Sequence, residues 1–246
     1  MIYLTKAVAV APVYETENVN TFKLFNNYFF KRECMFDDNV FFEPWIGDNY
    51  GKENSEFNAK ILVLGDSHYC DSCKDCGDKE KKVGCINFTS RVVMDYLNPD
   101  FKATWKRTYS RFINSFYGQS TNYDERMRFF KSICFYNFLQ VAAGDNPYEA
   151  SGGGHNSARH VNALKSVLQE LSPAIVIVWG SRTWNIIPND LGYGKADIIS
   201  ESNFQIKNYQ FRDNTITFIG VHHPCCSYDT ELHYNLFKKL KISLSK

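Results

Sequence analysis

Four short runs of apolar residues recur along the chain, and segments with helical periodicity separate them. The runs are residues 61–65 (ILVLG), 132–138 (SICFYNF), 174–180 (AIVIVWG) and 215–221 (TITFIGV). Continuous apolar runs of this length are typical of strands that are buried on both faces of a sheet. The alternation of strand and helix predicts an α/β fold, with a three-layer α/β/α arrangement around a central, mostly parallel four-stranded sheet.

Two of the segments between these runs have the apolar spacing of helices. Residues 88–97 contain Thr89 near their start, a residue type that often caps the first turn of a helix. Residues 157–171 place apolar side chains three and four positions apart, and Ser172-Pro173 ends the pattern. Both segments are predicted to be helices that cover the sheet.

The length of 246 residues suits one domain with a full core, so residues 1–246 are taken as a single domain. Residues 1–58 are predicted to form an N-terminal helical extension, because aromatic residues between positions 22 and 29 recur at helical spacing. Residues 70–85 are predicted to form a cysteine-rich loop inserted after the first strand.

The residues with the most chemical potential lie directly after the four apolar runs. In a parallel sheet the carboxyl ends of the strands meet at one edge, and ligands bind outside that edge. We therefore expect a single cleft built from four strand ends. Its residues would be Asp66, Ser67 and His68 after the first run, Asn137 at the end of the second, Ser181 and Arg182 after the third, and His222, His223 and Pro224 after the fourth.

Taken in chain order, these strand ends resemble the motifs of the uracil-DNA glycosylase superfamily. The corresponding stretches are GDSHY at 65–69, ICFYNFLQ at 133–140, LSPAIVIVWGSRTW at 171–184 and HHPCCSY at 222–228. The resemblance covers roughly residues 58–240 and suggests a divergent member of the superfamily. It implies a uracil-DNA glycosylase-like fold and a hydrolase of DNA repair by base excision, which cleaves the N-glycosidic bond of uracil or a related damaged base.

The resemblance also assigns roles to individual residues. Asp66 stands where the thermophile-type motif Gly-Glu-Ala-Pro-Gly has its glutamate, and a carboxylate there can orient water under the sugar. Asn137 corresponds to the asparagine that reads the base edge, since an amide can both donate and accept a hydrogen bond. Phe88 corresponds to the ring that stacks on the base. His223 corresponds to the histidine of His-Pro-Ser, which stabilises the departing base anion.

Two positions depart from the pattern. Ser67 stands where the best-known branch has its water-activating aspartate, and Cys225 stands where the serine of His-Pro-Ser would be. Ser67 remains a base-binding candidate, together with Tyr69. The departures keep open a second function, in which a divergent protein binds or processes a free base, nucleoside or nucleotide without DNA glycosylase activity. In a third reading the core is a scaffold and the cysteine-rich loop contacts a protein or a nucleic acid.

Each candidate also has a structural interpretation. Asp66 could cap whatever follows the strand, Asn137 could satisfy backbone groups at a strand end, and Phe88 could belong to the core. One of the two adjacent histidines at 222 and 223 could be structural. His68 is interpreted first as a surface residue, with metal binding and catalysis as the alternatives.

The cysteines of the loop follow the spacing C-x2-C-x2-C-x8-C, formed by Cys70, Cys73, Cys76 and Cys85. Such spacing lets thiolates converge on one ion, and the loop has few apolar residues around which to fold. The pattern predicts a metal site with all four as ligands, either structural zinc or a [4Fe-4S] cluster. Some glycosylases of the superfamily carry a four-iron cluster, but on cysteines elsewhere in the chain. The alternative is a set of reduced thiols.

The charges nearly balance, with 28 Lys and Arg against 27 Asp and Glu, so binding to nucleic acid would need a local basic surface. Residues 101–113 (FKATWKRTYSRFI) offer one, because they contain four cations and no acid. We expect a core-packed helix with a positive outer face. The candidate DNA contacts are Lys102, Lys106, Arg107 and Arg111, together with Arg182. The expected partner is single- or double-stranded DNA or a nucleobase-containing ligand.

No apolar run approaches the roughly 18 residues that a membrane span needs. The first residues also lack the basic start and long apolar middle of a signal peptide. These features predict a cytoplasmic protein with no membrane partner. No nucleotide cofactor is expected.

Overall fold

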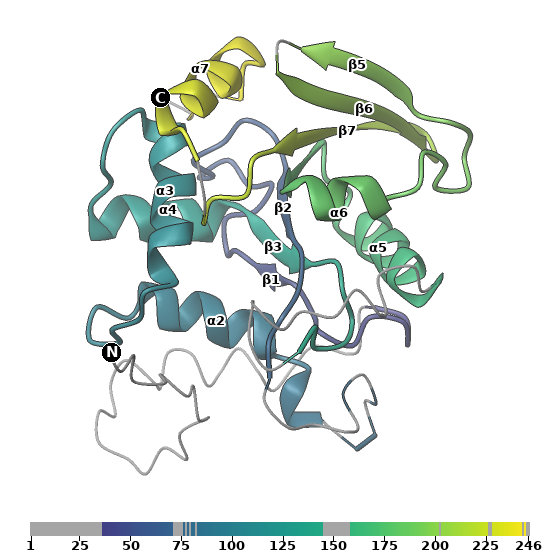
Figure 1. Cartoon of the computed structure of the whole chain (residues 1–246), viewed down its shortest axis with the longest axis horizontal. Helices are drawn as coiled ribbons and strands as arrows, with labels where there is room; N and C mark the ends of the chain where they lie inside the picture. The colour runs from purple at the N-terminus through teal and green to yellow at the C-terminus, as the bar shows by residue number, and fades with distance from the viewer. Residues whose placement is uncertain are drawn as a thin grey trace, which may run out of the picture. The chain divides into compact units, whose positions relative to one another are not determined.

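The computed structural model describes residues 36–70, 76, 78, 80–81, 83–144, 158–201, 203–225, 228–242 and 244. These residues belong to one compact unit, Phe36–Lys246. Its centre is a seven-stranded sheet with the strand order β1-β3-β2-β4-β7-β6-β5 (Figure 1). The strands are β1 (Trp45–Ile46), β2 (Ile61–Gly65), β3 (Cys134–Asn137), β4 (Ile175–Trp179), β5 (Asp197–Glu201), β6 (Phe204–Phe211) and β7 (Asn214–Val221).

The α/β class is confirmed, but the prediction of a mostly parallel four-stranded sheet is wrong. The four predicted strands correspond to β2, β3, β4 and β7, which form a continuous parallel block in the order β3-β2-β4-β7. The sheet is extended by β1 at one edge and by β6 and β5 at the other, and all three of these strands pair antiparallel to their neighbours. The sheet is therefore mixed.

The three additional strands carry weak sequence signals. Strand β1 has only two residues. Strand β5 reads DIISE and is almost entirely exposed, so it lacks an apolar run. Strand β6 has apolar residues at Phe204, Ile206, Tyr209 and Phe211, so the alternation between polar and apolar residues changes phase within the strand and no continuous apolar run forms. A search for continuous apolar runs cannot find such strands.

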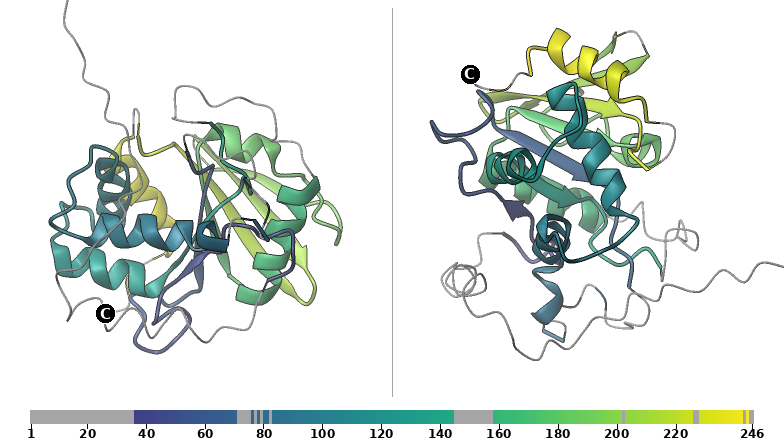
Figure 2. Two further views of the ribbon diagram at one scale, coloured as in Figure 1. Left: turned by 90° about the horizontal axis from the view of Figure 1, so that it is seen from below. Right: turned by 90° about the vertical axis from the view of Figure 1, so that its left-hand side faces the viewer.

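Helices cover both faces of the sheet (Figure 2). Helices α5 (Ala158–Leu171) and α6 (Ser181–Ile186) share one core with Leu62 and Leu64 of β2. Ile61 and Val63 point into the opposite core. That core is shared with α2 (Phe88–Leu97), α3 (Lys106–Tyr117), α4 (Tyr123–Ser132) and α7 (Thr230–Lys239). The alternation of side chains along a strand therefore explains why β2 is apolar throughout.

The predicted helices are found at nearly the predicted positions. Helix α2 has the predicted bounds, and α5 begins one residue later than expected. Thr89 does not cap α2, because Asn87 precedes the helix and Thr89 is buried within its first turn. Helix α4 begins with a capping box, in which the side chain of Asn122 accepts the backbone N–H of Glu125 and the side chain of Glu125 accepts that of Asn122.

Residues 36–58 contain turns and strand β1 and no helix, while the rest of the predicted N-terminal extension lies outside the described residues. The cysteine-rich loop contains one short 3-10 helix, η1 (Val83–Cys85), among its described residues. Within the described part of the chain, no helix is long and apolar enough to cross a membrane.

Candidate functional site

The candidate site lies where the direction of the chain crossovers changes. From β2 the chain continues to β3 on one side, and from β4 it continues, through the outer hairpin, to β7 on the other side. Strands β2 and β4 are themselves neighbours, so a topological switch point lies at their carboxyl ends. In open α/β sheets, ligands bind at such a point.

Asp66 and Arg182 bridge the two sides of this switch point. Asp66 directly follows β2 and is buried, and Arg182 lies in the first turn of α6 just after β4. The guanidinium of Arg182 donates two hydrogen bonds to the carboxylate, with Nε 2.9 Å from Oδ1 and Nη2 bonded to Oδ2. Thr183 Oγ1 donates a third to Oδ1 at 3.1 Å. Asp66 therefore does not cap a helix that follows it in the chain.

These contacts fix the charge state of Asp66. Burial raises the pKa of its carboxyl, but the hydrogen bonds and charge of Arg182, with smaller effects of Ser67 and Thr183, lower it further, so the net pKa lies below the usual value. The hydrogen bond to Asp66 in turn raises the pKa of Arg182. The pair is ionised at neutral pH, and the carboxylate is largely neutralised by its partner.

His68 is buried, and its interpretation as a surface residue is wrong. Its imidazole is 4% exposed, and its Nε2 lies 3.0 Å from Thr89 Oγ1 on α2. The ring packs edge-on against Phe42 and Phe88, with a centroid distance of 4.7 Å to each. Burial, together with the positive charge of Arg91, lowers the pKa of His68 to about 3, so the ring is neutral at physiological pH.

Asn137 ends β3 and contacts both His68 and Gly65. Its amide Nδ2 lies 3.3 Å from Nδ1 and 3.2 Å from Nε2 of His68. Its Oδ1 lies so close to Gly65 that a Cβ at residue 65 would approach it to 2.2 Å. Among the hydrogen bonds of the described residues, this side chain thus contacts His68 and no backbone group.

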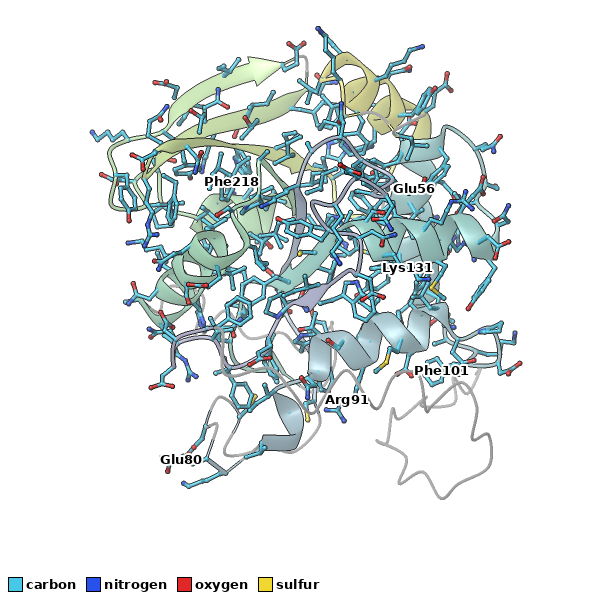
Figure 3. The ribbon with its side chains drawn as sticks, turned by 180° about the vertical axis from the view of Figure 1, so that it is seen from behind. Glu56, Glu80, Arg91, Phe101, Lys131 and Phe218 are labelled. Carbon is cyan, nitrogen blue, oxygen red and sulfur yellow. The ribbon has the colours of Figure 1, made fainter. Side chains whose placement is uncertain are left out.

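Phe88 and Asn137, the predicted base-stacking and base-reading residues, therefore both contact His68. Phe88 is half-buried at the start of α2, outside the two main clusters of the core. The guanidinium of Arg91, which is labelled in Figure 3, lies 5.1 Å from the centre of the Phe88 ring. His68 thus takes up the contacts that a base held by Phe88 and Asn137 would make.

His223 lies near enough to Asp66 and Arg182 for both charges to shift the pKa of its imidazole. Gly180, at the end of β4, comes so close that a Cβ there would be 3.2 Å from Cβ of His223. The backbone N–H of Cys225 donates to Nδ1 of His223 at 3.2 Å. Because Nδ1 accepts this bond, the neutral ring carries its proton on Nε2.

The surroundings of His223 favour this neutral form. Burial lowers its pKa, and of the nearby charges Asp66 raises the pKa while Arg182 lowers it, with a net pKa below the usual value. The structural histidine of this region is His233 on α7, a residue that the motif did not include. Its Nε2 accepts the backbone N–H of His222 at 3.3 Å, and Nδ1 lies 2.6 Å from the carbonyl oxygen of Asp229.

The two remaining base-binding candidates lie on the same segment after β2. Ser67 is half-buried, and its hydroxyl makes no hydrogen bond of ordinary geometry within the described residues, although it lies close enough to Asp66 to lower that residue's pKa. Tyr69 is half-buried against the core shared with α5 and contributes to the raised pKa of Arg182. Among the described residues, neither Ser67 nor Tyr69 forms a side-chain hydrogen bond with Asn137.

The basic residues of the predicted DNA-contact segment have different local roles. Lys102 Nζ and Lys106 Nζ each lie 2.5 Å from carbonyl oxygens just after α2, those of Pro99 and Asn98. Arg107 is exposed on α3. Arg111 instead reaches residues 224 and 225, beside His223. The two lysines therefore also stabilise the end of a helix.

The predicted metal site is only partly covered by the structure. Cys70, Cys76 and Cys85 are half-buried and form no disulfide with one another, and Cys73 lies outside the described residues. Cys76 Sγ accepts the backbone N–H of Ala142 at 3.0 Å. Among the residues that the structure places, no group of three or more His, Cys, Asp or Glu could hold a metal ion. Binding of zinc or a [4Fe-4S] cluster stays a prediction.

A groove of about 460 Å³ lies elsewhere, at the other end of α6. Lys207 lines it, with Nζ 3.5 Å from the carbonyl oxygen of Trp184 and 3.3 Å from that of Ile187. The ammonium lies 4.5 Å from the centre of the Trp184 ring. These contacts satisfy the last carbonyls of α6, so the lysine has a structural role.

Sequence comparison finds no related protein that could support these observations. No protein-family model matches the chain, and no curated protein is significantly similar to it. The functional interpretation therefore depends on the residues themselves.

Thr183, Thr89 and His233 are the site residues that sequence reasoning missed. Thr183 follows Arg182 directly, and its place at the start of a helix after a buried strand could have indicated that its hydroxyl lies near the strand ends. Thr89 was interpreted as a cap, and His233 has no motif around it. The partners of both come from distant parts of the chain, which no local pattern reveals.

Proposed function

We propose that this protein hydrolyses N-glycosidic bonds, with uracil or a related damaged base in DNA as the substrate. The observation that carries the proposal is the convergence of Asp66, Arg182 and His223 at the switch point, with the His223 proton held on Nε2. The α/β sheet with helices on both faces is consistent with the uracil-DNA glycosylase-like fold that this function implies. Four motifs in the same chain order provide further support.

In the proposed reaction the bond between the sugar carbon C1′ and the base nitrogen breaks, and its electron pair leaves with the base. The negative charge spreads onto a carbonyl oxygen of the base, where Nε2–H of His223 donates a hydrogen bond. A neutral donor of this kind is suited to stabilise an anion in a site from which water is excluded. Water then adds its oxygen to C1′ and loses a proton, which finally resides on the released base.

Asp66 would act by its negative charge beside the sugar, more than by accepting a proton. Its carboxylate already accepts three hydrogen bonds from Arg182 and Thr183, and its pKa is below the usual value, so it is a weak base. An anion fixed near C1′ still opposes the positive charge that develops on the sugar. Release of Arg182, for example to a substrate phosphate, would strengthen that effect.

Binding of a base in this site requires His68 to move. The amide of Asn137 is hydrogen-bonded to the imidazole of His68, and the Phe88 ring packs in a T-shaped contact against the same imidazole. A base that stacks on Phe88 and pairs with Asn137 would take over both contacts. Because His68 is neutral, its displacement does not require a buried charge to be moved.

A second candidate function is the binding or processing of a free base, nucleoside or nucleotide. The observation that favours it is the neutralisation of Asp66 by Arg182, which leaves the site without an evident group to activate water. In that case Asn137 and Phe88 would recognise the base in the same way, and no strand of DNA would be needed.

A cleavage assay separates the two functions. End-labelled single- and double-stranded DNA with one uracil is incubated with the protein, treated with alkali to cut abasic sites, and compared with thymine-containing DNA. Parallel strands carry hypoxanthine and other damaged bases. We expect strand cleavage at uracil or at one of these bases, and loss of kcat by about 10²–10³-fold in His223→Ala, since one anion donor is removed. Asp66→Ala and Asn137→Ala are expected to lose activity as well.

Asp213→Asn is the matched control, because it removes a carboxylate from an exposed turn between β6 and β7. Every variant is checked by circular dichroism and thermal unfolding before the assay. Absence of cleavage for every base tested would reject the glycosylase proposal. Calorimetric binding of free bases or nucleosides, abolished by Asn137→Ala, would then establish the second function.

A further inference from the structure

The side chain of Arg111 on α3 reaches the segment that carries His223. Its Nη1 donates to the carbonyl oxygen of Cys225 at 3.0 Å and lies 3.5 Å from that of Pro224. Helices α3 and α7 pack against each other on the face of the sheet where this segment runs (Figure 1). Arg111 was predicted as a DNA contact, but its guanidinium is directed at backbone carbonyls within the protein.

One peptide group links Arg111 to the imidazole of His223. The carbonyl oxygen of Pro224 and the N–H of Cys225 belong to the same planar trans peptide, so they point in opposite directions. Arg111 holds the oxygen side of this peptide, and the N–H side donates to Nδ1 of His223. The same Nη1 also donates to the carbonyl oxygen of Cys225, the residue whose N–H bonds to His223.

The other side of His223 is held by α7. Nε2 of His233 accepts the N–H of His222, and the His233 ring stacks on Tyr228 at a centroid distance of 3.9 Å. The hydroxyl of Tyr228 lies 2.9 Å from Ser115 Oγ on α3, four residues after Arg111. Two helices thus fix the backbone on both sides of His223, which would otherwise lie in an unsupported turn.

We infer that Arg111 is a positioning residue for His223: through the Pro224–Cys225 peptide it keeps the imidazole proton on Nε2, where the proposed hydrolysis uses it. The inference rests on the proposed function for its catalytic consequence, but the positioning itself is a property of the protein without substrate. If Nδ1 gained a proton, two N–H groups would face each other, so the bond that Arg111 maintains favours the neutral ring.

The test follows the His223 ring by NMR with ¹⁵N-labelled histidine, with the His223 signal identified by its absence in His223→Ala. In the native protein we expect a protonated Nε2, an unprotonated Nδ1 and a pKa below the usual value. In Arg111→Gln we expect the pKa of His223 to rise by about 0.5–1 pH unit, the equivalent of one lost hydrogen bond. Arg111→Lys, which keeps the charge but ends in a shorter side chain with a compact ammonium group, is expected to lie between them.

Arg107→Gln is the control, because it removes the same charge from the same helix without touching the His223 segment. An unchanged pKa of His223 in Arg111→Gln, or an equal rise in Arg107→Gln, would overturn the inference, since only a long-range charge effect would remain. These spectra need no substrate. A shifted pKa in a protein without glycosylase activity would therefore reject the proposed function and leave the positioning role intact.

If the native protein is active, kinetics provide a second measurement. A positioning role predicts that Arg111→Gln lowers kcat by about 10–100-fold with little change in KM, as misplacement of a reacting group does. Loss of a phosphate contact would instead raise KM and reduce the salt dependence of DNA binding. A raised KM and a reduced salt dependence, together with an unaltered His223 spectrum, would show that Arg111 contacts DNA and does not position His223.

Discussion

Gly65 is the residue whose substitution tests the geometry of the site most directly. An alanine at this position would place its Cβ 2.2 Å from Oδ1 of Asn137 and 3.2 Å from Cζ of Phe135. Carbon and oxygen atoms cannot approach to the first of these distances, so Asn137 must rotate. Rotation breaks its contact with His68 inside a buried region.

The cost of Gly65→Ala follows from these contacts. Overpacking of a tight core costs about 1–3 kcal/mol, and loss of the hydrogen bond between Asn137 and His68 adds about 1 kcal/mol. We expect the free energy of unfolding to fall by about 2–4 kcal/mol, together with complete loss of base binding or cleavage. Gly84→Ala is the matched control, since a Cβ at residue 84 would meet no atom within 4 Å. Its effect should stay within about 0.5 kcal/mol.

Urea unfolding of a double-mutant cycle isolates the clash. Asn137→Ala removes the side chain that the new methyl group would meet, so Gly65→Ala should cost about 1–3 kcal/mol less in that background than in the native chain. The contact with Phe135 remains in both. If Gly65→Ala is equally costly with and without the Asn137 side chain, the strain arises elsewhere and our description of the site is wrong.

Three further predictions concern the pH dependence, the loop and the surface. The pKa of His68 is about 3 in the folded chain and 6.5 in the unfolded chain, so the unfolded state binds more protons between these pH values. The urea concentration at the unfolding midpoint should therefore fall as the pH drops from about 6.5 towards 3. His68→Gln should make this midpoint depend less on pH. Elemental analysis of purified protein should find bound zinc or iron, and Cys76→Ser should reduce the amount of bound metal. Native protein that contains no metal and in which four loop thiols react with a thiol reagent would reject the metal site and support a set of reduced cysteines. Arg107→Gln should weaken binding to DNA and lower the slope of log K against log salt by about 1, whereas an unchanged slope would exclude a phosphate contact at this residue.

The central strands could be predicted from the sequence because burial on both faces leaves a local signature. Strand β2 matches its prediction at both ends, and β4 and β7 match within a residue. Strands β5 and β6 could not be found in this way, because β5 pairs with β6, β6 pairs with β7, and polar residues interrupt the apolar residues of both strands. Apolar periodicity depends on burial, so it does not predict strands whose residues are only partly buried.

The site was predictable in its location but not in its internal contacts. The rule that ligands bind at strand ends placed Asp66, Asn137 and His223 on one edge of the sheet. It could not show that Arg182 neutralises Asp66, because an ion pair between residues so far apart in the chain depends on the strand order. For the same reason the burial of His68 was missed, since its partners lie on α2 and β3.

The strand order also has a consequence for how the chain reaches its native state. Strands β6 and β7 are joined by a tight turn and can pair early, because closing a short loop costs little entropy. The pairing of β2 with β4 instead joins Ile61 to Ile175 and must wait until the intervening chain is organised. The carboxyl ends of these two strands are therefore brought together late in folding, after β6 and β7 have paired. Ligand binding at these strand ends would stabilise the part of the fold that is slowest to form.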